Sequence, residues 1–418
     1  ASPLHFMRRR RPASEPGGIH GFDEADPAPS TYRFEKKHVW SLKNNPLCGV
    51  GLPQWLRILW RRGRHIDYLQ YGHRVLFITF MAVVNSLLGL LELLLYGRIV
   101  AERARDADGF RQERPVFVLG HPRSGTTLLQ GLLALDSEQF RFCSTFCAGF
   151  PLSFLWFEDL GKRLFRGVID KKRPMDNMAL HFDLPQEDEL ATNVLSAGVS
   201  PYMPLWFMRQ ERAFRDYFTF EHAAPGDSNA WLEAFKHLLA KLWVREKRSR
   251  AHPRRLLLKS PPHTARVRLL LQLFPEAQFV YVHRHPLEVF RSAAHMADTT
   301  YWYTYLAEPS PAEIQEFILS QYDILWEAYE RDRKELLERP QRLVEVRFED
   351  LTNKPVATLE KIYNHFGWDG FDHVLPALEE ECWGLQGYKR NVLAALPPGL
   401  EQTVRKRWAA SFQRLGYA

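Results

Sequence analysis

The segment from residue 116 to residue 135 constrains the fold more than any other part of the chain. A short apolar run at 116–119 is followed by Gly120 and Gly125, and the sequence then takes a helical pattern at 126–135. A buried strand, a glycine-containing loop and a helix in this order direct the loop amides toward a ligand at the positive end of the helix, which binds anions. The segment therefore predicts an α/β fold with a phosphate-binding loop at the edge of a sheet.

The remaining strands and helices follow from the same patterns. Short apolar runs are typical of buried parallel strands, and amphipathic stretches with a helical period are typical of the helices that cover them. We expect a P-loop-like, mostly parallel central sheet flanked by helices, with a large helical insertion between the first two strands and a hydrophobic helix near the N-terminus. The expected strands are 116–119, 256–258, 279–282 and 343–346, and the clearest helices are 229–248, 264–274 and 313–338.

The loop departs from the common G-x-x-x-x-G-K-[ST] pattern, because Thr126 and Thr127 follow Gly125 where a lysine is usual. Arg123 lies inside the loop and could hold phosphate oxygens with its planar guanidinium. The amides from Ser124 to Thr127 would face the same ligand, and the threonine hydroxyls could donate further hydrogen bonds. The loop is therefore expected to bind an anion without the usual lysine.

Positive side chains also stand at the ends of other expected strands, at Lys259, Arg284 and Arg347. A kinase or nucleotide triphosphatase would need an acidic side chain at such a position to hold magnesium. That class of enzyme therefore remains only an alternative. A second alternative is a non-catalytic, membrane-associated scaffold that kept the fold of an enzyme.

In this context, PRSGTT at 122–127 resembles the 5′-phosphosulfate loop P-[KR]-S-G-T-[TS] of the sulfotransferases that use 3′-phosphoadenosine 5′-phosphosulfate (PAPS). The second motif of that family, R-x-P with a serine eight residues after the arginine, is similar to Arg284-His285-Pro286 with Ser292. The resemblance extends over roughly residues 50–395. Further stretches that match one large branch of the family are RPMDNM at 173–178, PQEDELA at 185–191, LKSPPHT at 258–264, FEDL at 348–351 and YKRN at 388–391.

The resemblance implies a sulfotransferase domain at 111–418. Its activity would be transfer of a sulfuryl group from PAPS, as co-substrate and without a metal ion, to a hydroxyl rather than an amine of a lipid-like or carbohydrate acceptor. Lys259 would contact the transferring sulfonate, and Arg123 would share in stabilising the reaction. The implied contacts to the 5′-phosphosulfate come from Arg123, Ser124, Gly125, Thr126 and Thr127, and those to the 3′-phosphate from Arg284, Ser292, Lys389 and Arg390.

The general base stays open between carboxylates and a histidine. Glu187 and Glu189 lie in an acidic run with Asp188, whose like charges could raise a carboxyl pKa toward neutrality. The other candidate is His263, since the histidine side chain as a residue type suits proton removal at physiological pH. Many relatives place a glutamate shortly after the first loop helix, but residues 143–150 contain no acid. Glu187, Glu189, His263 or none of these could therefore remove the acceptor proton.

The N-terminal third carries two further signals. Residues 1–35 contain a run of four arginines and no periodicity, which predicts a disordered basic tail or targeting segment. Residues 36–110 read as a helical region that could anchor the chain to a membrane. Basic amphipathic sequence at 53–74 leads into an apolar stretch at 75–96, which at ~1.5 Å per residue could just cross a bilayer core of about 30 Å.

The apolar stretch has more than one interpretation. It could insert into a membrane, lie in the membrane plane, or pack as a helix of a soluble body in which Glu92 meets a partner. Arginines flank it on both sides, so the charge rule gives no orientation. We expect membrane association through 53–96, with an endomembrane location and a cytoplasmic one both open.

Composition limits the partners. Lys and Arg number 56 against 49 Asp and Glu, and this net charge of +7 favours anionic ligands, while no nucleic-acid-binding motif is present. Four cysteines at Cys48, Cys143, Cys147 and Cys382 are too scattered for a disulfide framework or a zinc site. Aromatic residues could line an acceptor pocket or simply form core. They are Trp156, Phe157, Phe182, Tyr202, Trp206, Phe207, Tyr217, Phe218, Phe220, Tyr301, Trp302, Tyr303 and Tyr305.

Overall fold

The computed structural model describes residues 30–167, 170–247, 254–385, 391 and 393–417. Within these ranges five strands form a sheet in the order β2-β3-β1-β4-β5, and every pairing is parallel. The strands are β1 (Val116–Leu119), β2 (Phe140–Arg141), β3 (Arg255–Lys259), β4 (Gln278–His283) and β5 (Leu343–Arg347). The expected α/β fold and parallel sheet are confirmed. The sequence does not predict β2, because two residues carry no periodic pattern.

Helices fill the connections between the strands, as the sequence predicts. The N-terminal helices are η1 (Pro46–Gly49), α1 (Leu52–Arg62), η2 (Gly63–His65), α2 (Tyr68–Arg105) and α3 (Ala107–Gln112). Those between β1 and β3 are α4 (Thr126–Leu133), α5 (Thr145–Gly149), α6 (Phe154–Phe165), α7 (Asp188–Leu195), α8 (Pro204–Phe207), η3 (Met208–Tyr217) and α9 (Asp227–Lys247). Those between β3 and β5 are η4 (Pro261–Ala265), α10 (Val267–Leu273), α11 (Pro286–Thr300), η5 (Tyr301–Tyr303) and α12 (Pro311–Leu337). Those after β5 are α13 (Phe348–Asn353), α14 (Pro355–Phe366), α15 (Phe371–Leu385), α16 (Pro398–Arg407) and α17 (Ala409–Leu415).

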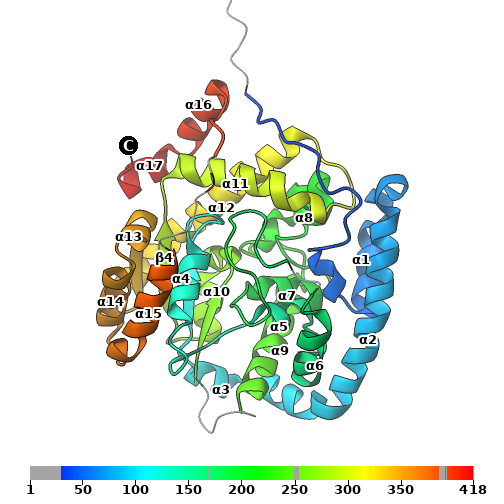
Figure 1. Ribbon diagram of the computed structural model, residues 1–418, viewed down its shortest axis with the longest axis horizontal. Coiled ribbons are helices and arrows are strands. Elements are labelled where there is room, and N and C mark those ends of the chain that lie inside the picture. Colours follow the sequence, from blue (N-terminus) through cyan, green and yellow to red (C-terminus); the bar gives the residue numbers. More distant parts are fainter. Residues whose placement is uncertain (1–29, 168–169, 248–253, 386–390, 392, 418) are drawn as a thin grey trace, which may run out of the picture.

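The sheet is buried on both faces. Side chains alternate along β1, so that Val116 and Val118 pack into one core and Phe117 and Leu119 into the other. Helices α4, α14 and α15 supply the first core, and Figure 1 shows α13, α14 and α15 stacked on that side of the molecule. Helices α9, α10 and α12, together with the long insertion, supply the second core.

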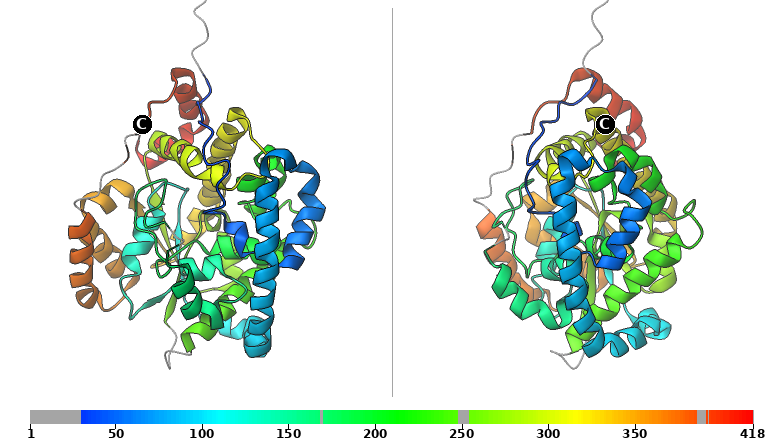
Figure 2. Two further views of the ribbon diagram at one scale, coloured as in Figure 1. Left: turned by 45° about the vertical axis from the view of Figure 1, so that its right-hand side comes forward. Right: turned by 90° about the vertical axis from the view of Figure 1, so that its right-hand side faces the viewer.

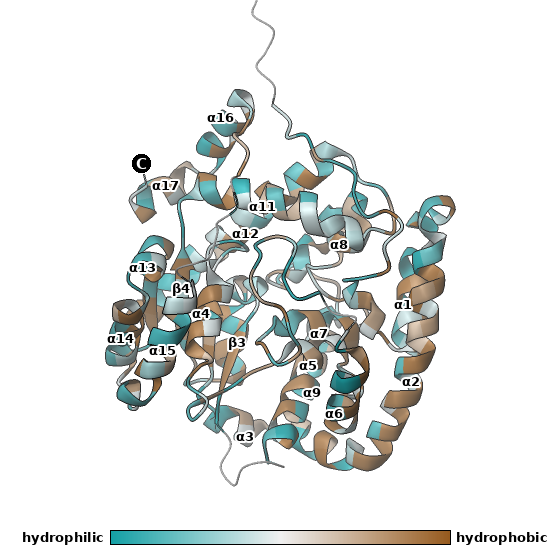
Figure 3. Cartoon of the chain, in the orientation of Figure 1, coloured by the Kyte–Doolittle hydropathy of each residue, from teal (hydrophilic) through white to brown (hydrophobic). Residues whose placement is uncertain are grey.

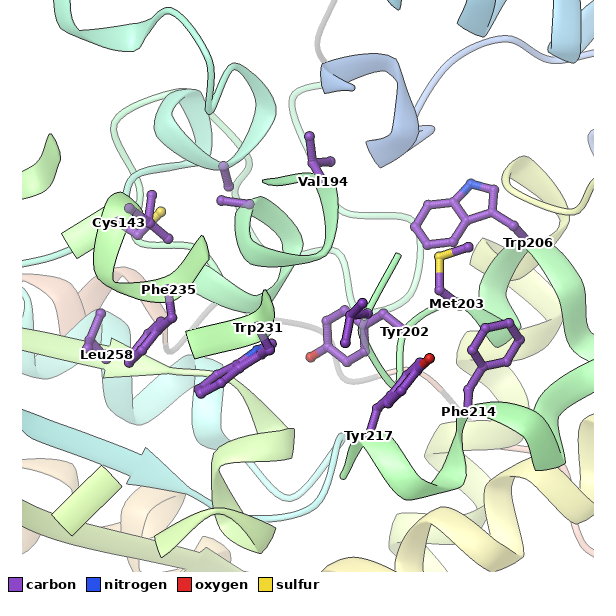
Figure 4. Packing of buried hydrophobic residues seen from close by; sticks show 14 of the residues in the cluster. Cys143, Val194, Tyr202, Met203, Trp206, Phe214, Tyr217, Trp231, Phe235 and Leu258 are labelled. Atoms are coloured by element: carbon purple, nitrogen blue, oxygen red, sulfur yellow. The ribbon is translucent and has the colours of Figure 1, made fainter. Parts of the chain in front are cut away.

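The second core is rich in aromatic side chains. Trp231 and Phe235 of α9 stack with their ring centroids 4.9 Å apart and lie close to Leu258 of β3 (Figure 4). Of the aromatic residues that the sequence offers for an acceptor pocket, Trp206 and Tyr305 are fully buried core residues. Others, described below, line a cavity.

Helix α2 lies along the outside of the body beside α1 (Figures 1 and 2). Its inward-facing polar side chains all bind the body, because burying them without partners would be costly. Arg74 donates to the carbonyl oxygens of Trp302 and Tyr305, Asn85 donates to those of Cys48 and Val50, Glu92 pairs with Lys241, and Arg103 pairs with Glu113.

The opposite side of α2 is apolar, as Figure 3 shows by its hydrophobic colouring. This side, called the outer face below, consists of Leu76, Phe80, Val83, Leu87, Leu90, Leu91, Leu93, Leu94 and Leu95, all of them exposed. By length and composition α2 could cross a membrane, so the expected hydrophobic helix is confirmed.

Part of the expected tail belongs to the folded body. The amide of Tyr32 donates to Gln315 on α12 at 3.1 Å, and the amide of Glu35 donates to Asp298 on α11 at 2.7 Å. Residues 30–35 therefore join the body, which corrects the boundary expected at residue 35. Residues 1–29 lie outside the described ranges.

Candidate active site

The loop between β1 and α4 is held in a conformation that requires glycine at both ends. Gly120 has φ +141°, and a Cβ there would lie 2.5 Å from the carbonyl oxygen of Val282. Gly125 has φ +105°, and a Cβ there would collide with the ring of Phe348. Arg123 between them also has a positive φ of 75°, which costs about 1–3 kcal/mol in a residue other than glycine. The surrounding contacts must therefore fix this loop.

The side chain of Arg123 joins two sequence-distant segments. Its Nε donates to Ser292 Oγ at 3.0 Å, and its Nη1 donates to Asp176 Oδ2 at 2.8 Å. Its carbonyl oxygen accepts a hydrogen bond from Arg284 Nη1 at 3.3 Å. The parallel sheet explains this meeting, since β1 and β4 are neighbours and present their carboxyl ends at one edge. Arg123, Arg284 and Ser292 thus lie together, as expected from the sequence.

A cavity of about 350 Å³, called the basic cavity below, opens over this cluster. The ring of Phe348 forms part of its wall, and the guanidinium of Arg284 lies 4.5 Å from the centre of that ring. Ser124 is buried and its Oγ donates to the carbonyl oxygen of His121. The expected site residues that line this cavity are Arg123, Gly125, Thr126, Thr127, Arg284 and Ser292. Lys389 and Arg390 lie outside the described residues.

A second cavity of about 530 Å³, called the apolar cavity below, begins on the other side of the same loop. Arg123, Thr126 and Thr127 line both cavities. Away from the loop its wall is mostly apolar and comes from segments far apart in the sequence. Its apolar lining includes Leu42, Phe77, Met81, Phe150, Phe165, Leu180, Phe182, Leu205, Tyr301 and Phe317.

Lys259 links Glu187, on the wall of the apolar cavity, to Thr127, which lines both cavities. Lys259 Nζ donates to Glu187 Oε1 at 2.7 Å and to Thr127 Oγ1 at 3.3 Å, and the hydroxyl of Tyr202 donates to Glu187 Oε2 at 2.5 Å. Glu187 and Tyr202 line the apolar cavity, and Glu187 keeps 22% of its side chain exposed. This carboxylate is therefore within reach of a ligand in that cavity.

The electrostatics of this pair follow from burial and mutual attraction. Burial lowers the pKa of Lys259, and the Glu187 carboxylate opposes that effect. Burial also works against ionisation of Glu187, but the Lys259 ammonium and the Tyr202 hydroxyl outweigh it, so the pKa of Glu187 lies below its ordinary value. In the ligand-free site Glu187 is thus a carboxylate.

The next two acids of the run are sealed away from both cavities. Asp188 Oδ2 lies 2.6 Å from His263 Nε2, and Glu189 accepts hydrogen bonds from both terminal nitrogens of Arg266 at 2.7 and 3.2 Å. These four side chains are fully buried, and none belongs to the described cavity linings. Of the three candidate bases, Glu187 is the one whose side chain lines a described cavity.

The expected cause of a raised carboxyl pKa is wrong. The sequence suggests repulsion among Glu187, Asp188 and Glu189, but each acid pairs with a different basic residue. For Asp188, burial opposes ionisation but His263 and Ser260 outweigh it, and its pKa is lowered rather than raised. Hydrogen-bonding partners on η4 and at the end of β3 therefore outweigh the like charges along the run.

Several residues of the site have no role that the sequence alone predicts. Asp176 lies in the RPMDNM stretch, which the resemblance singles out without a role, and it holds Arg123. Phe348 belongs to the FEDL stretch, which the resemblance also singles out without a role, yet it packs on Gly125 and Arg284. Asn391 of YKRN donates to the carbonyl oxygen of Met175 at 3.0 Å. The sequence signal for these residues was that each lies in a stretch that matches the same family branch, in the same order along the chain.

Within the described ranges, no three His, Cys, Asp or Glu side chains are grouped so that they could hold a metal ion. The four cysteines are all free thiols, and Cys143 and Cys147 are buried.

Comparison with known proteins identifies the family. The family model described as "Sulfotransferase family" matches residues 115–373. Omega-hydroxy-beta-dihydromenaquinone-9 sulfotransferase Stf3 of Mycobacterium bovis and its namesake from Mycobacterium tuberculosis are each 30% identical over 392 residues, which cover 93% of this chain and 95% of the relative.

Solved structures agree in fold. Sulfotransferase STF1 of Mycobacterium tuberculosis superposes with a TM-score of 0.56 at 18% identity, over 86% of this chain and 92% of that one. Sulfotransferase STF9 of Mycobacterium avium superposes with a TM-score of 0.54 at 16% identity, over 88% of this chain and 96% of that one. These matches support neither a kinase or triphosphatase nor a non-catalytic scaffold. The chain belongs to the sulfotransferase family and is an enzyme, a sulfotransferase.

Proposed function

We propose that the chain transfers a sulfuryl group from PAPS to the hydroxyl of a lipid-like acceptor. The observation that carries the proposal is the meeting of a basic cavity and an apolar cavity at one loop, with Arg123, Thr126 and Thr127 lining both. A charged nucleotide suits the first cavity and an apolar chain suits the second. The group to be transferred would then lie at their junction.

The basic cavity fits the donor. Arg123 and the amides at the start of α4 would hold the 5′-phosphosulfate, and Arg284 with Ser292 would hold the 3′-phosphate. Lys389 and Arg390 would close over the same phosphate, as the resemblance implies. PAPS, when bound, supplies a sulfuryl group whose bond to the 5′-phosphate breaks as sulfur bonds to the acceptor oxygen. Fixed positive charge at Arg123 and Lys259 would stabilise the leaving phosphate oxygens. That this needs no metal ion remains a prediction.

The apolar cavity favours a lipid over a carbohydrate. Its far wall consists of aromatic and aliphatic side chains such as Phe150, Phe165 and Phe182. A sugar would need several hydrogen-bonding partners there, whereas an alkyl or isoprenoid chain needs none. The curated relatives are named for an omega-hydroxy-beta-dihydromenaquinone-9 acceptor, which supports the same class.

Glu187 is the base that we propose. Its carboxylate faces the apolar cavity next to Lys259 and would take the proton of the acceptor hydroxyl as the oxygen bonds to sulfur. We infer that an anionic donor draws the Lys259 ammonium away from Glu187. A buried carboxylate that loses its counter-ion has a raised pKa, which makes Glu187 a stronger base only once the donor is bound.

We also propose that the enzyme is membrane-associated through 53–96, with α2 lying on the membrane rather than crossing it. A spanning α2 would have to leave the partners of Arg74, Asn85 and Glu92 on the body. Breaking even one buried ion pair typically costs about 3–5 kcal/mol. A helix that keeps these bonds and buries its outer face in the lipid interface avoids that cost.

Two measurements test this function. Calorimetry should detect 3′-phosphoadenosine 5′-phosphate binding to the purified protein in the presence of a chelator. Incubation with radiolabelled PAPS and a membrane lipid extract, in parallel with a polysaccharide extract, should label the lipid fraction. Folded protein that binds no nucleotide, or label confined to polysaccharide, would contradict the proposal.

A further inference from the structure

We propose that the apolar cavity opens directly to the membrane along α2, so that the acceptor passes from the bilayer into the active site without crossing water. The inference rests on the proposed function and adds the route and the surface to it. It also assigns two roles to α2, as a wall of the cavity and as a membrane contact.

One helix separates the cavity from the exterior. Phe77 and Met81, one turn apart on α2, line the apolar cavity. Leu76 and Phe80 belong to the same turn and point outward, with 74% and 62% of their surface exposed. The cavity wall and the outer face are therefore adjacent sides of the same helical turns.

The mouth of the cavity lies beside this helix. Among the described lining residues, the exposed ones are Leu42 and Lys43, which precede η1. Arg123 and Glu187 line the same cavity and are less exposed than Leu42 and Lys43. A chain that enters with its hydroxyl first would thus bring that hydroxyl to Glu187 and leave its apolar tail toward Leu42 and Phe77. Such an acceptor carries its hydroxyl at the end of an apolar chain.

The surroundings of the mouth have the chemistry of a membrane contact. Other large apolar side chains are exposed on neighbouring elements. They are Trp40, two residues before Leu42, Trp60 on α1 and Leu164 on α6, with exposed fractions of 77%, 89% and 62%. Tryptophan is the side chain that membrane interfaces favour. Figure 2 shows α1 and α2 side by side on this side of the molecule.

The charged side chains of α1 indicate that a membrane, rather than a protein partner, covers this surface. Arg57 and Arg61 of α1 and Arg64 after it are exposed close to Trp60 in the sequence. Between Leu76 and Leu95, in contrast, the exposed side chains of α2 are leucine, valine and phenylalanine. Basic side chains beside an uncharged apolar face match a bilayer with anionic headgroups, where arginines meet phosphates and the apolar face meets acyl chains. A protein partner would not require basic side chains on α1 to be kept apart from an uncharged apolar face on α2.

The first experiment separates membrane contact from catalysis. Vesicles of phosphatidylcholine and phosphatidylglycerol carry a trace of hexadecanol as acceptor, and the same alcohol is offered in a nonionic detergent. The double variant Phe80→Asp, Leu87→Asp should lose vesicle binding on the order of 100-fold, because charges on an inserted face are strongly disfavoured. Its sulfation of vesicle hexadecanol should fall in parallel, while that of detergent-dispersed hexadecanol stays within about twofold of the wild type.

A matched variant and a second readout complete the test. Leu337→Asp places a charge on an exposed leucine of α12 and should change neither vesicle binding nor transfer. Met81→Trp, on the cavity side of α2, should leave vesicle binding intact and reduce transfer from both preparations. If the Phe80→Asp, Leu87→Asp variant instead bound vesicles with the affinity of the wild type, the proposal that the outer face contacts the membrane would be wrong.

Cross-linking tests the route itself and does not depend on transfer. A hexadecanol with a photoactivatable diazirine in its chain, added at trace level to the same vesicles, should label Phe77, Met81 and the segment 42–48 of the bound protein. Label confined to the outer face would show membrane contact without access to the cavity, and would overturn the proposal. A failure of the proposed function would give a different result. The protein would then bind no nucleotide, or would not sulfate detergent-dispersed hexadecanol, while the cross-linker still labelled the cavity wall.

Discussion

Two ion pairs join the start of α7 to β3 and to the segment that follows it, and they differ in how accessible they are to a ligand. Glu187, which lines the apolar cavity, pairs with Lys259, whereas Glu189 pairs with Arg266 in a fully buried setting. The acids are two residues apart and the bases seven residues apart, so neither composition nor local charge distinguishes them. The two pairs differ because the Glu187 side chain faces the apolar cavity and the Glu189 side chain faces the buried interior.

The start of α7 produces this difference. Glu187 is the residue before the helix and has an extended backbone, while Asp188 and Glu189 form its first turn. The change of backbone conformation turns Glu187 toward the apolar cavity and its successors toward η4 and Arg266. The comparison teaches that a reachable ion pair can serve chemistry, whereas a sealed one serves the fold.

The largest expected effect lies on the sealed side. Glu189→Gln leaves the Arg266 guanidinium buried without its counter-ion and should lower the free energy of unfolding by about 3–5 kcal/mol. Glu187→Gln should lower it by about 1 kcal/mol or less, because Lys259 keeps its hydrogen bond to Thr127 and, unlike the Arg266 guanidinium, can lose its proton when buried. Urea titration of both variants measures the difference. Equal losses would remove the distinction between the two pairs.

Catalysis should respond in the reverse order. Glu187→Gln keeps the shape of the side chain but removes the base, and kcat should fall by about 10²–10³-fold. Binding of 3′-phosphoadenosine 5′-phosphate by this variant should match the wild type. A kcat within a factor of about three of the wild type would assign the base to another residue.

Nucleotide affinity should depend on the cations that line the basic cavity. Arg284→Ala removes a guanidinium from the expected 3′-phosphate site and should weaken 3′-phosphoadenosine 5′-phosphate about 10- to 100-fold in calorimetry. Arg291 on α11, the helix that follows Arg284, instead donates to the carbonyl oxygens of Leu393 and Ala394. Arg291→Ala is therefore the matched control and should change affinity about twofold at most. Comparable losses in both variants would point to net charge rather than a defined site.

The smallest effect concerns pH. The pKa of Asp188 is lowered in the folded state, because His263 and Ser260 outweigh burial. A carboxyl with a depressed pKa contributes stability above its unfolded value, near 3.8, and loses that contribution as pH falls through the lower folded value. Unfolding followed from pH 7 to pH 2 should therefore show a shallower decline below about pH 4 in Asp188→Asn than in the wild type. An equally steep decline would mean that Asp188 is not held ionised by its neighbours.

The sequence predicts the frame of the site well. The loop at 120–125 and the basic residues Lys259 and Arg284 follow from short-range patterns, and a parallel sheet brings strand ends to one edge. Four of the described strands follow from apolar runs. These features depend on local sequence or on a general rule of the fold.

Other features depend on partners distant in the sequence. The pairing of Arg123 with Asp176 crosses 53 positions, and that of Glu189 with Arg266 crosses 77. The direction of the pKa change at Glu187 depends on Lys259, 72 positions away, so like charges within the acidic run gave the wrong sign. The apolar character of α2 is equally compatible with crossing a membrane or lying on it. The proposal that it lies on a membrane depends on its bonds to the body through Arg74 and Glu92, which the sequence alone does not show.

The most direct test is a single turnover at the junction of the two cavities. Wild type and Glu187→Gln are each saturated with radiolabelled PAPS in the presence of a chelator and mixed with detergent-dispersed hexadecanol. The account predicts rapid labelling of the alcohol by the wild type and a rate about 10²–10³-fold lower for the variant at equal donor occupancy. Equal rates, or a wild-type reaction that appears only when magnesium is added, would contradict it.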